Sequence, residues 1–509
     1  MTTASAAQTF ESVNPATGEI VATFPVQGQK EVDEAVTRAR EGAEWWAGLE
    51  WRERRVRLLA WKSHMVRYME RLAQLIHDEG GKPLDDAKLE VVLAVLHLDW
   101  AARHAHRVLG SHRVPSGLAM INMASSLSYE PLGVVGVIGP WNYPLFTPMG
   151  SVGYALAAGN AVVFKPSELT PAVGSWMVSS FAEVLSEVFG DPAVSGSVLQ
   201  LVTGDGSTGS ALAASGVDKI AFTGSPGTAR KVMATAALSL TPVLAECGGK
   251  DALLVDSSAN LDDAADAAAW GGMSNAGQTC IGIERVYVHS AVFDSFVAKL
   301  RERVSSLRPG SDPSASYGPM TLPSQTSVIS RHISSALSSG GQALVGGESS
   351  VRSPYVDPVI LVDTPESSPA VQEETFGPVL TVRPVPSLAE GVRLANASGY
   401  ALGSAVFSGS RSAGLSAARA LRAGMTSVNS VLAFAAVPSL PFGGSGESGF
   451  GRIHGEDGLR AFARAKSVTR QRMKPLVTTM SFSRTPADTS RLVRLITLLH
   501  GRQYRRPRR

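Results

Sequence analysis

Two residues of this 509-residue chain have side chains suited to covalent catalysis. Cys280 ends the Asn- and Gly-containing segment 273–280, and it is one of only two cysteines. Upstream, Glu246 stands just before the Gly248-Gly249 turn. A thiol is a soft nucleophile and a carboxylate can act as a base, so the pair indicates covalent chemistry on a carbonyl group. The rest of the chain must then hold a carbonyl substrate and its co-reactant beside Cys280.

The second cysteine, Cys247, directly follows Glu246, so which of the two thiols reacts is a fair question. We interpret Cys280 as the nucleophile and Cys247 as a packed apolar thiol. Two cysteines in such a length do not form a disulfide framework, which is typical of a reducing compartment. The N-terminus lacks the basic and apolar regions of a secretion signal, and no run of about 20 apolar residues predicts a membrane-spanning helix. We therefore expect a cytoplasmic protein.

Size and charge limit the function classes. A chain of 509 residues with 44% hydrophobic residues is large enough for two or three domains. The formal net charge is +3, but the segment 491–509 holds seven arginines and no acidic residue. The remainder of the chain is therefore net negative. This distribution disfavours a nucleic-acid-binding body.

Apolar residues recur at helical spacing in the N-terminal part and predict helices over 31–46, 52–79 and 88–108. The histidines of these helices have no convincing partner at metal-ligand spacing, so we interpret them as helix-surface residues and expect no metal site. From residue 134 onward, short apolar strands alternate with helices. The expected strands cover 134–138, 161–164, 198–202 and 219–222, and the expected helices cover 151–158, 170–188, 208–214 and 228–237.

A second series of the same kind begins near Gly249. Its expected strands cover 252–255, 285–289, 379–382, 404–407 and 425–429, and its expected helices cover 261–271, 292–307 and 388–397. The segment 311–353 is rich in Ser and Gly and is expected to form loops with one helix inside. The polar, β-prone segment 118–130 is expected to form an extended arm. Apolar strands joined to helices by short turns predict an α/β protein with two doubly wound, Rossmann-like domains.

The turns of the first series suggest where an anion would bind. No G-x-G-x-x-G follows the first parallel strand, so the usual dinucleotide fingerprint is missing. The segments 202–206 and 222–227 instead each close a strand and supply glycine and a helix N-terminus, which can bind phosphate. Lys165 and Glu168 follow another strand and could hold the hydroxyl groups of an adenosine ribose. A glutamate there favours an unphosphorylated 2′-hydroxyl, and hence NAD over NADP.

These motifs, in this order, resemble the aldehyde dehydrogenase superfamily. The resemblance extends from about Asn14 to about Ser467, and any one motif is modest whereas the set in register is specific. The matching stretches are 14–19 (NPATGE), 140–144 (PWNYP), 165–168 (KPSE), 222–225 (FTGS), 246–250 (ECGGK), 277–280 (GQTC), 374–378 (ETFGP) and 441–444 (PFGG) with Ser448-Gly449.

The resemblance implies a domain organisation. It consists of a nucleotide-binding domain over 1–112 and 132–246 and a catalytic domain over 247–448. A small β arm for bridging and oligomerisation covers 113–131 and 449–480, and a basic tail covers 481–509. Members with such an arm form oligomers, so we expect a homodimer or homotetramer.

The resemblance also assigns roles. It makes Cys280 the nucleophile, Glu246 the general base and Asn142 the side-chain donor to the oxyanion. The implied reaction oxidises an aldehyde to a carboxylic acid with NAD, or alternatively NADP, through a thioester on Cys280 that water hydrolyses. The implied cofactor contacts are Ile138, Pro140, Trp141, Lys165, Ser167, Glu168, Gly206, Phe222, Gly224, Ser225, Glu374 and Phe376.

Several alternatives stay open at this point. A coenzyme A-acylating member tends to lack the base, so Glu246 argues against it, and Cys280 with Asn142 argues against a non-catalytic, structural or ligand-binding member. The substrate is a small-molecule aldehyde whose identity is open, with long-chain fatty aldehydes and succinate semialdehyde as candidates. The apolar and Arg-rich tail predicts either peripheral contact with an anionic membrane or a docked or disordered tail.

Overall fold

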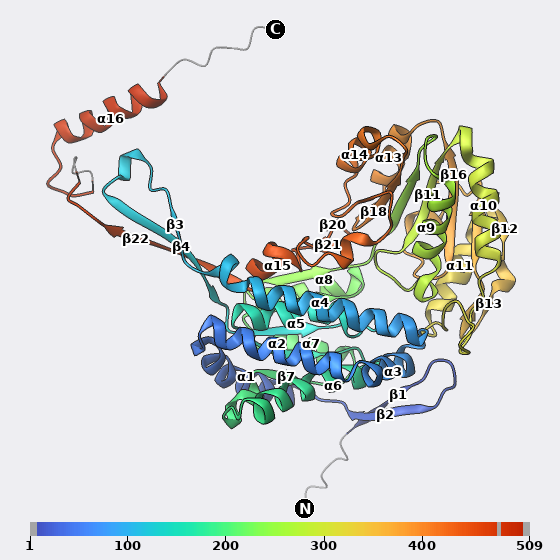
Figure 1. Cartoon of the computed structure of the whole chain (residues 1–509), viewed down its shortest axis with the longest axis horizontal. Helices are drawn as coiled ribbons and strands as arrows, with labels where there is room; N and C mark the ends of the chain where they lie inside the picture. Colours follow the sequence, from blue (N-terminus) through green and yellow to red (C-terminus); the bar gives the residue numbers. More distant parts are fainter. Residues whose placement is uncertain (1–7, 476–479, 502–509) are drawn as a thin grey trace, which may run out of the picture. The chain divides into compact units, whose positions relative to one another are not determined.

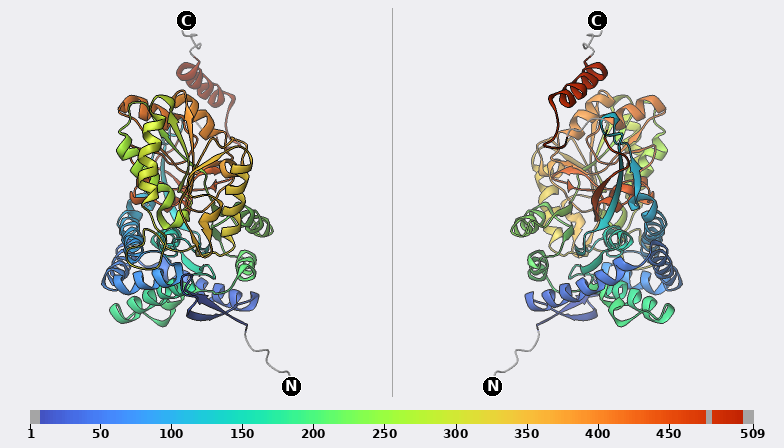
Figure 2. Two further views of the ribbon diagram at one scale, coloured as in Figure 1. Left: turned by 90° about the vertical axis from the view of Figure 1, so that its right-hand side faces the viewer. Right: turned by 90° about the vertical axis from the view of Figure 1, so that its left-hand side faces the viewer.

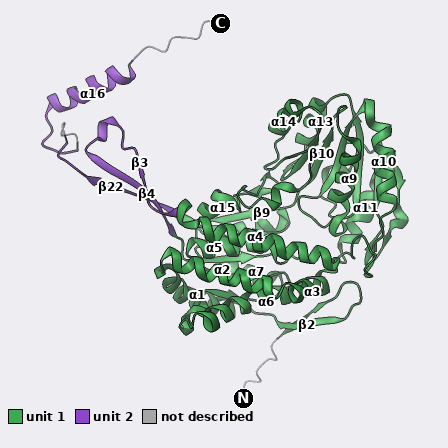
Figure 3. Ribbon diagram, in the orientation of Figure 1, with its two compact units in different colours: residues 1–108, 131–463 green, residues 109–130, 464–509 purple. Residues whose placement is uncertain are grey.

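The computed structural model describes residues 8–475 and 480–501 and consists of two compact units (Figure 3). Unit 1 comprises Met1–Val108 and Pro131–Ala463, and unit 2 comprises Leu109–Glu130 and Arg464–Arg509. Unit 1 contains both large sheets and every residue predicted to take part in the chemistry. The predicted α/β fold class with parallel, helix-covered sheets is confirmed.

The first large sheet has the strand order β21-β9-β8-β5-β6-β7. Five of its strands are parallel to one another: β5 (Val134–Ile138), β6 (Ala161–Lys165), β7 (Leu199–Leu201), β8 (Lys219–Thr223) and β9 (Val243–Glu246). The short edge strand β21 (Gly449–Phe450) pairs with β9 in the antiparallel direction. Every residue of β5 and β6 is buried, which explains their unbroken apolar sequences.

Helices cover both faces of this sheet (Figure 1). Alternate strand residues such as Val134 and Val163 pack in one cluster with apolar residues of α1 (Gln29–Gly48), α7 (Gly206–Ala214) and α8 (Pro226–Ala237). Successive strand residues point to opposite faces, so the other face is left for α5 (Phe146–Ala158) and α6 (Pro171–Glu183), which pack on β5, β6 and β7.

The N-terminal region departs from its predicted form in three places. The helix expected over 52–79 is broken at Tyr68 (φ −101°, ψ 21°) into α2 (Trp51–Arg67) and α3 (Met69–Gly80), a local backbone change that the apolar pattern does not report. A hairpin of β1 (Thr9–Val13) and β2 (Ile20–Pro25), which was not predicted, precedes them. The helix predicted over 88–108 corresponds to α4 (Leu84–Leu109). Its residue His97 is fully buried, so the expectation of a helix-surface histidine is wrong there.

The second large sheet has the strand order β12-β15-β16-β11-β10-β18-β19. Helices α9 (Leu261–Met273), α10 (Phe293–Ser305) and α11 (Gln325–Ser338) pack in the core on one face, and α13 (Leu388–Asn396) and α14 (Arg411–Ala420) pack on the other. Figure 2 shows this part of the chain, coloured yellow-green to orange, from two further sides. The strands are β10 (Asp251–Val255), β11 (Ile283–His289), β12 (Gln342–Val345), β15 (Val359–Val362), β16 (Val379–Val385), β18 (Ser404–Phe407) and β19 (Ser427–Val428). The sequence did not predict β12, β15 or α14.

Unit 2 contains a three-stranded sheet, in the order β22-β4-β3, and one helix. Its strands are β3 (His112–Val114), β4 (Met123–Pro131) and β22 (Ala463–Gln471), and its helix is α16 (Pro486–His500). Glu130 and Lys466 form an ion pair of 2.5 Å within this unit. None of the helices in the described part of the chain has the length and apolar character that a membrane span requires.

Candidate active site

The register of the first sheet brings several predicted residues to its carboxyl-terminal edge. Ile138 at the end of β5 lies opposite Lys165 on β6 and opposite Phe222 on β8. Thr223, one residue further along β8, lies opposite Glu246 at the end of β9. Ligands bind at this edge in open parallel sheets. Residues far apart in the sequence therefore meet because parallel strands end together.

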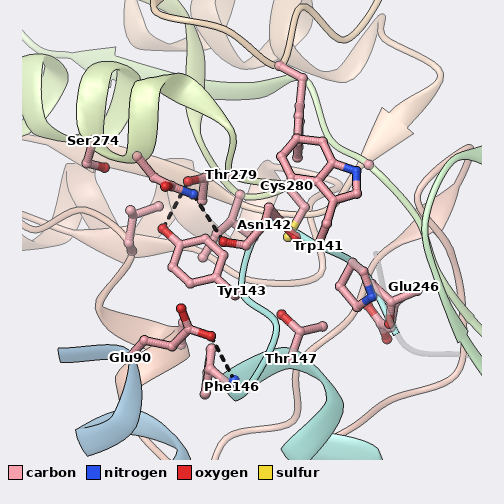
Figure 4. A pocket seen from close by; sticks show the side chains of 18 of the residues that line it. Glu90, Trp141, Asn142, Tyr143, Phe146, Thr147, Glu246, Ser274, Thr279 and Cys280 are labelled. Atoms are coloured by element: carbon pink, nitrogen blue, oxygen red, sulfur yellow. Dashed lines mark hydrogen bonds between the residues drawn. The ribbon is translucent and has the colours of Figure 1, made fainter. Parts of the chain in front are cut away.

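A cavity of about 380 Å³ in unit 1 unites the three predicted catalytic residues. Asn142, Glu246 and Cys280 all line it, as do Pro140, Trp141, Gly224, Ser225, Glu374 and Phe376 from the predicted cofactor set. Figure 4 shows Cys280 in the middle of the view, with Tyr143 to one side and Glu246 to the other. A volume of this size is within the range of small-molecule sites. Cys280 and Glu246 thus share one cavity, as the sequence analysis required.

The loop that carries Cys280 has an unusual backbone. Asn275, Ala276 and Gly277 have φ values of 52°, 56° and 71°, so three successive residues are left-handed. A Cβ on Gly277 would come within 2.2 Å of the backbone of Gly377, so only glycine fits this contact. Ala276 at positive φ is strained, and such strain persists where the surrounding structure holds it. This loop therefore fixes the position of Cys280 just before β11.

The electrostatic surroundings of Cys280 oppose its ionisation. Its side chain is half-buried, and burial together with the carboxylates of Glu374, Asp251 and Glu246 raises the pKa of the Cys280 thiol. Cys247 is 4% exposed, and burial raises the pKa of its thiol to about 12. Cys247 also lines the cavity and packs in the core cluster against β9. Exposure, rather than thiol acidity, distinguishes Cys280 as the reactive candidate.

Glu246 is a buried carboxylate without hydrogen-bond partners. It is 3% exposed, and neither of its carboxylate oxygens has a partner among the described residues. Burial raises the pKa of Glu246 well above its ordinary value, and the positive charge of Arg452 opposes that rise. A Cβ on Gly443 would lie 2.7 Å from Glu246 Oε1, so this glycine makes room for the carboxylate. Buried polar groups are normally satisfied, so an unpaired carboxylate facing a cavity indicates a functional group.

The side-chain amide of Asn142 has two N–H groups, of which one is hydrogen-bonded to another described residue. Its Nδ2 donates to the Gln278 carbonyl oxygen at 2.9 Å. The backbone carbonyl oxygen of Asn142 accepts from Lys82 Nζ at 2.7 Å and from Asn275 Nδ2 at 3.2 Å. The backbone of Asn142 is therefore held by two hydrogen bonds and its side-chain amide by one, and the second N–H of Nδ2 has no partner among the described residues and is available to a developing oxyanion beside Cys280.

The predicted ribose contacts lie at the sheet edge but outside this cavity. Lys165 is 4% exposed and donates from Nζ to the Pro166 carbonyl oxygen at 3.0 Å. It also pairs with Glu168 Oε2 at 3.5 Å, and Glu168 in turn accepts from Ser167 Oγ at 3.4 Å. Burial lowers the pKa of Lys165, and Glu168 opposes this effect. Half of the predicted cofactor contacts, all of them described residues, lie outside the lining of this cavity: Ile138, Lys165, Ser167, Glu168, Gly206 and Phe222.

Two helix N-termini flank this edge as the glycine turns predicted. Gly206 is the first residue of α7, whose N-cap is Asp205. Ser225 is the N-cap of α8 and accepts from the backbone N–H of Thr228 at 3.3 Å. Of the two, only the α8 terminus reaches the cavity, through Thr223, Gly224 and Ser225. The positive end of the helix dipole favours an anionic group there.

Another part of the cavity wall comes from the loop that precedes β16 and carries Glu374 and Phe376. The ring of Phe376 packs edge-on against Trp141, with centroids 5.5 Å apart. Glu374 Oε1 accepts from the backbone N–H of Gly249 at 2.9 Å, and burial raises the pKa of Glu374 to about 8. A Cβ on Gly248 would lie 2.2 Å from this carboxylate, so the Gly-Gly turn is required by close approach.

The model of the aldehyde dehydrogenase family matches residues 2–468 of this chain. The chain belongs to the aldehyde dehydrogenase family. A 4,4′-diapolycopene aldehyde oxidase of a Methylomonas species is 36% identical, over 89% of this chain and 84% of that protein. The Mycobacterium ulcerans protein named putative succinate-semialdehyde dehydrogenase (NADP+) 2 is 34% identical, over 96% of this chain and 94% of its own length. The solved betaine aldehyde dehydrogenase of Staphylococcus aureus in complex with NAD+ is 28% identical, with a TM-score of 0.86 and coverage of 93% and 96%.

Sequence reasoning missed two buried ion pairs that support this aldehyde dehydrogenase site. Lys250 Nζ contacts Glu284, which also accepts from the backbone N–H groups of Thr375 at 2.8 Å and Phe376 at 2.9 Å. This pair holds the loop that carries Glu374 and Phe376. Lys250 stands in the ECGGK motif, but its partner lies in an ordinary apolar strand, so no local signal identifies the pair.

The second pair, Lys82 and Glu90, is 2.6 Å long and its side chains are almost fully buried. Glu90 Oε1 accepts from the backbone N–H groups of Leu145 at 2.9 Å and Phe146 at 3.1 Å, which fixes the turn after Asn142. Lys82 precedes the start of α4 and Glu90 lies within it, eight residues later. No periodic pattern in the sequence therefore indicates that the two side chains form a pair. Both pairs position backbone segments of the site and were found only from the tertiary structure.

Proposed function

We propose that this aldehyde dehydrogenase family member oxidises an aldehyde to a carboxylic acid with NAD or NADP, through a thioester on Cys280. The observation that carries the proposal is the unpaired, buried carboxylate of Glu246 on the wall of the cavity that Cys280 also lines. A base held without partners in a cavity is available to water or substrate.

In the proposed reaction, the Cys280 thiol gives its proton to solvent and its Sγ bonds to the aldehyde carbon. The electron pair of the C=O π bond moves to the carbonyl oxygen, which becomes anionic. The free N–H of Asn142 and the backbone N–H of Cys280 stabilise this oxyanion, and losing one such donor costs about 3–4 kcal/mol. The C=O bond then re-forms, the hydrogen of the former aldehyde carbon departs as hydride to the nicotinamide acceptor, and a thioester remains on Cys280. Glu246 then removes a proton from water, the water oxygen attacks the thioester carbon, and the C–S bond breaks to release the acid.

The residues present fit a nicotinamide dinucleotide. The α8 N-terminus at Gly224 and Ser225 suits a pyrophosphate, and Lys165 with Glu168 suits ribose hydroxyl groups. Trp141, Phe376 and Glu374 line the cavity near Cys280 and suit the nicotinamide end. Bound NAD supplies the hydride acceptor. The exposed carboxylate of Glu168 supports NAD as the preferred form, because it would repel a 2′-phosphate.

The test is NADH or NADPH production from a panel of aldehydes by the wild type, Cys280→Ser and Cys247→Ser. Activity is expected in the wild type and in Cys247→Ser and is expected to be lost in Cys280→Ser. Identification of the product as the free acid, with and without coenzyme A, separates hydrolysis from acyl transfer. A product that depends on coenzyme A, or activity retained in Cys280→Ser, contradicts the proposal.

Two substrate classes follow from the names of the relatives. The Methylomonas protein is named for a polyene aldehyde and the Mycobacterium ulcerans protein for succinate semialdehyde. We propose the apolar class for this chain, a group that also includes long-chain fatty aldehydes. Support comes from the apolar side chains of the cavity wall, such as Leu93, Phe146 and Leu322.

We further propose that the C-terminal helix contacts an anionic membrane surface. Within unit 2, α16 exposes Val493, Ile496 and Leu498 together with Arg491 and Arg494. An apolar surface beside basic residues fits such a surface, and each basic residue near it contributes about 1 kcal/mol. Co-sedimentation with anionic and neutral liposomes at low salt tests this. Unchanged binding of the Arg491→Glu/Arg494→Glu variant to anionic liposomes would remove the idea.

The expected domain roles and assembly also stay proposals. We propose that the segments 1–112 and 132–246 hold the nucleotide and that 247–448 carries the catalytic cysteine. In unit 2, β3 and β22 are the edge strands of the small sheet, and edge strands offer unpaired backbone groups to a second chain. This supports a homodimer or homotetramer, which light scattering coupled to size-exclusion chromatography would measure. The predicted tail residues 502–509 lie outside the described residues.

A further inference from the structure

One side of the cavity is apolar and opens to solvent through apolar side chains. The wall includes the apolar side chains of Leu93, Phe146, Leu322, Leu432, Phe442 and Ile453. Leu89 on α4 and Trp270 on α9 also line the cavity and are 54% and 50% exposed. Large apolar side chains that are half-exposed at the mouth of a site indicate an interaction with an apolar ligand. The apolar surface therefore continues from the catalytic sulfur to the outside.

The charges on this side offer nothing to a second carboxylate. Lys82 is the only lysine or arginine among the described residues that line the cavity, and its Nζ is shared by Glu90 and the Asn142 carbonyl oxygen. The same ammonium group lies 4.1 Å from the ring centroid of Tyr143. Asp86 also lines the cavity and adds a negative charge. An acidic substrate would meet a repelling carboxylate and a lysine that is already neutralised.

Polar side chains interrupt the apolar wall at separate points, including Tyr143, Thr147, Ser274 and His454. The Tyr143 hydroxyl forms a hydrogen bond with Thr279 Oγ1 at 3.1 Å, as Figure 4 shows. His454 lines the cavity, but both its ring nitrogens are buried and have no partner among the described residues. Burial and the neighbouring His97 lower the pKa of His454 well below its ordinary value, so the ring is neutral. His454 offers a polar substrate one such partner, but a polar chain lying along Leu93, Phe146 and Leu322 would lose its hydrogen bonds to water without replacement.

From these features, and on the basis of the proposed function, we propose that the substrate is a neutral aldehyde with a long hydrocarbon chain. The chain occupies the apolar side of the cavity and leaves it between Leu89 and Trp270. Its carbonyl carbon lies at Cys280. Aldehydes with a carboxylate at the far end, including succinate semialdehyde, are rejected by Asp86 and by the absence of an unpaired cation on the described wall.

The first test compares kcat/KM along a series of straight-chain aldehydes from four to fourteen carbons. Each buried methylene is expected to raise kcat/KM by up to about fourfold until the chain reaches the mouth, where the increase stops. Succinate semialdehyde is expected to be worse than butanal, its neutral counterpart of equal length. A flat series, or a preference for the semialdehyde over butanal, overturns the proposal while leaving the proposed function intact.

The second test changes the mouth. Leu89→Asn is expected to lower the ratio of kcat/KM for dodecanal to that for butanal several-fold, because only the longer chain reaches residue 89. The matched control is Leu238→Asn, which alters a leucine that is 90% exposed and does not line the cavity; its ratio should equal that of the wild type. An unchanged ratio in Leu89→Asn contradicts the exit route.

A third measurement does not need turnover. Decanamide, an unreactive analogue of the long aldehyde, is expected to protect Cys280 from alkylation by iodoacetamide at lower concentration than succinamic acid does, as peptide mass spectrometry would quantify. Protection by succinamic acid at equal or lower concentration refutes the apolar assignment. If long amides protect Cys280 but no aldehyde yields NADH or NADPH, the proposed function fails and the apolar site stands.

Discussion

Replacing Glu246 by glutamine separates the two halves of the proposed reaction. Glutamine has nearly the same shape but cannot accept a proton from water at neutral pH. Cys280 and Asn142 keep their positions, so acyl-enzyme formation and the first NADH should persist. Hydrolysis of the thioester should slow, because the cavity wall then lacks its unpaired carboxylate. The expected pattern is one rapid equivalent of NADH followed by very slow turnover.

The size of the effect follows from the role of a general base. Loss of such a base costs about 10²–10⁴-fold in rate, or about 3–5 kcal/mol in the barrier to hydrolysis. The structure also predicts how the ionisation of Glu246 affects the stability of the fold. Because burial raises the folded-state pKa of Glu246 above 4.5, the protonated carboxyl favours the folded state; this contribution is complete below pH 4.5 and is lost as pH rises through the raised pKa. A permanently neutral glutamine should therefore leave the melting temperature at neutral pH unchanged or higher.

Stopped-flow NADH fluorescence gives the burst, and mass spectrometry of the intact protein detects the acyl group that should accumulate on Cys280. In the wild type, kcat should increase with pH through the raised pKa of Glu246, because only the ionised carboxylate accepts the proton from water. This increase should disappear in Glu246→Gln. The reasoning would be refuted by normal steady-state turnover of the variant, or by loss of the burst while the melting temperature is unchanged.

Three further predictions concern the rest of the site. Asn142→Ala should lower kcat/KM by about 10²–10³-fold without weakening NAD binding, since the lost N–H acts on the oxyanion; a change confined to NAD affinity would argue against that role. Lys250→Met should lower the free energy of unfolding by about 3–5 kcal/mol in urea titrations, because Glu284 is left as an unpaired buried charge. The double variant with Glu284→Gln should recover part of the loss, and equal losses in both would contradict the pairing. Glu168→Ala should raise the ratio of kcat/KM for NADP to that for NAD; an unchanged ratio would remove Glu168 as the determinant.

The secondary structure of the two sheets was largely predictable because its signals are local. An apolar run such as 134–138 followed by a glycine turn needs only neighbouring residues to be recognised, and β5 has those bounds. The failures lie where the local signal is weak. The break at Tyr68 leaves the apolar pattern uninterrupted. The buried state of His97 depends on packing against Phe146 and His454 from distant segments.

The proposed catalytic residues could be named from residue types and motifs, but their environment could not. The sequence by itself pointed to Cys280, Glu246 and Asn142 as candidates and to the strands and helices that precede or follow them. Only the tertiary structure decided that both oxygens of Glu246 are left without partners and that the ammonium group of Lys82 is neutralised. The physical reason is that charge, burial and hydrogen bonding depend on side chains brought together from distant segments, whereas helix and strand signals come from neighbours in the chain.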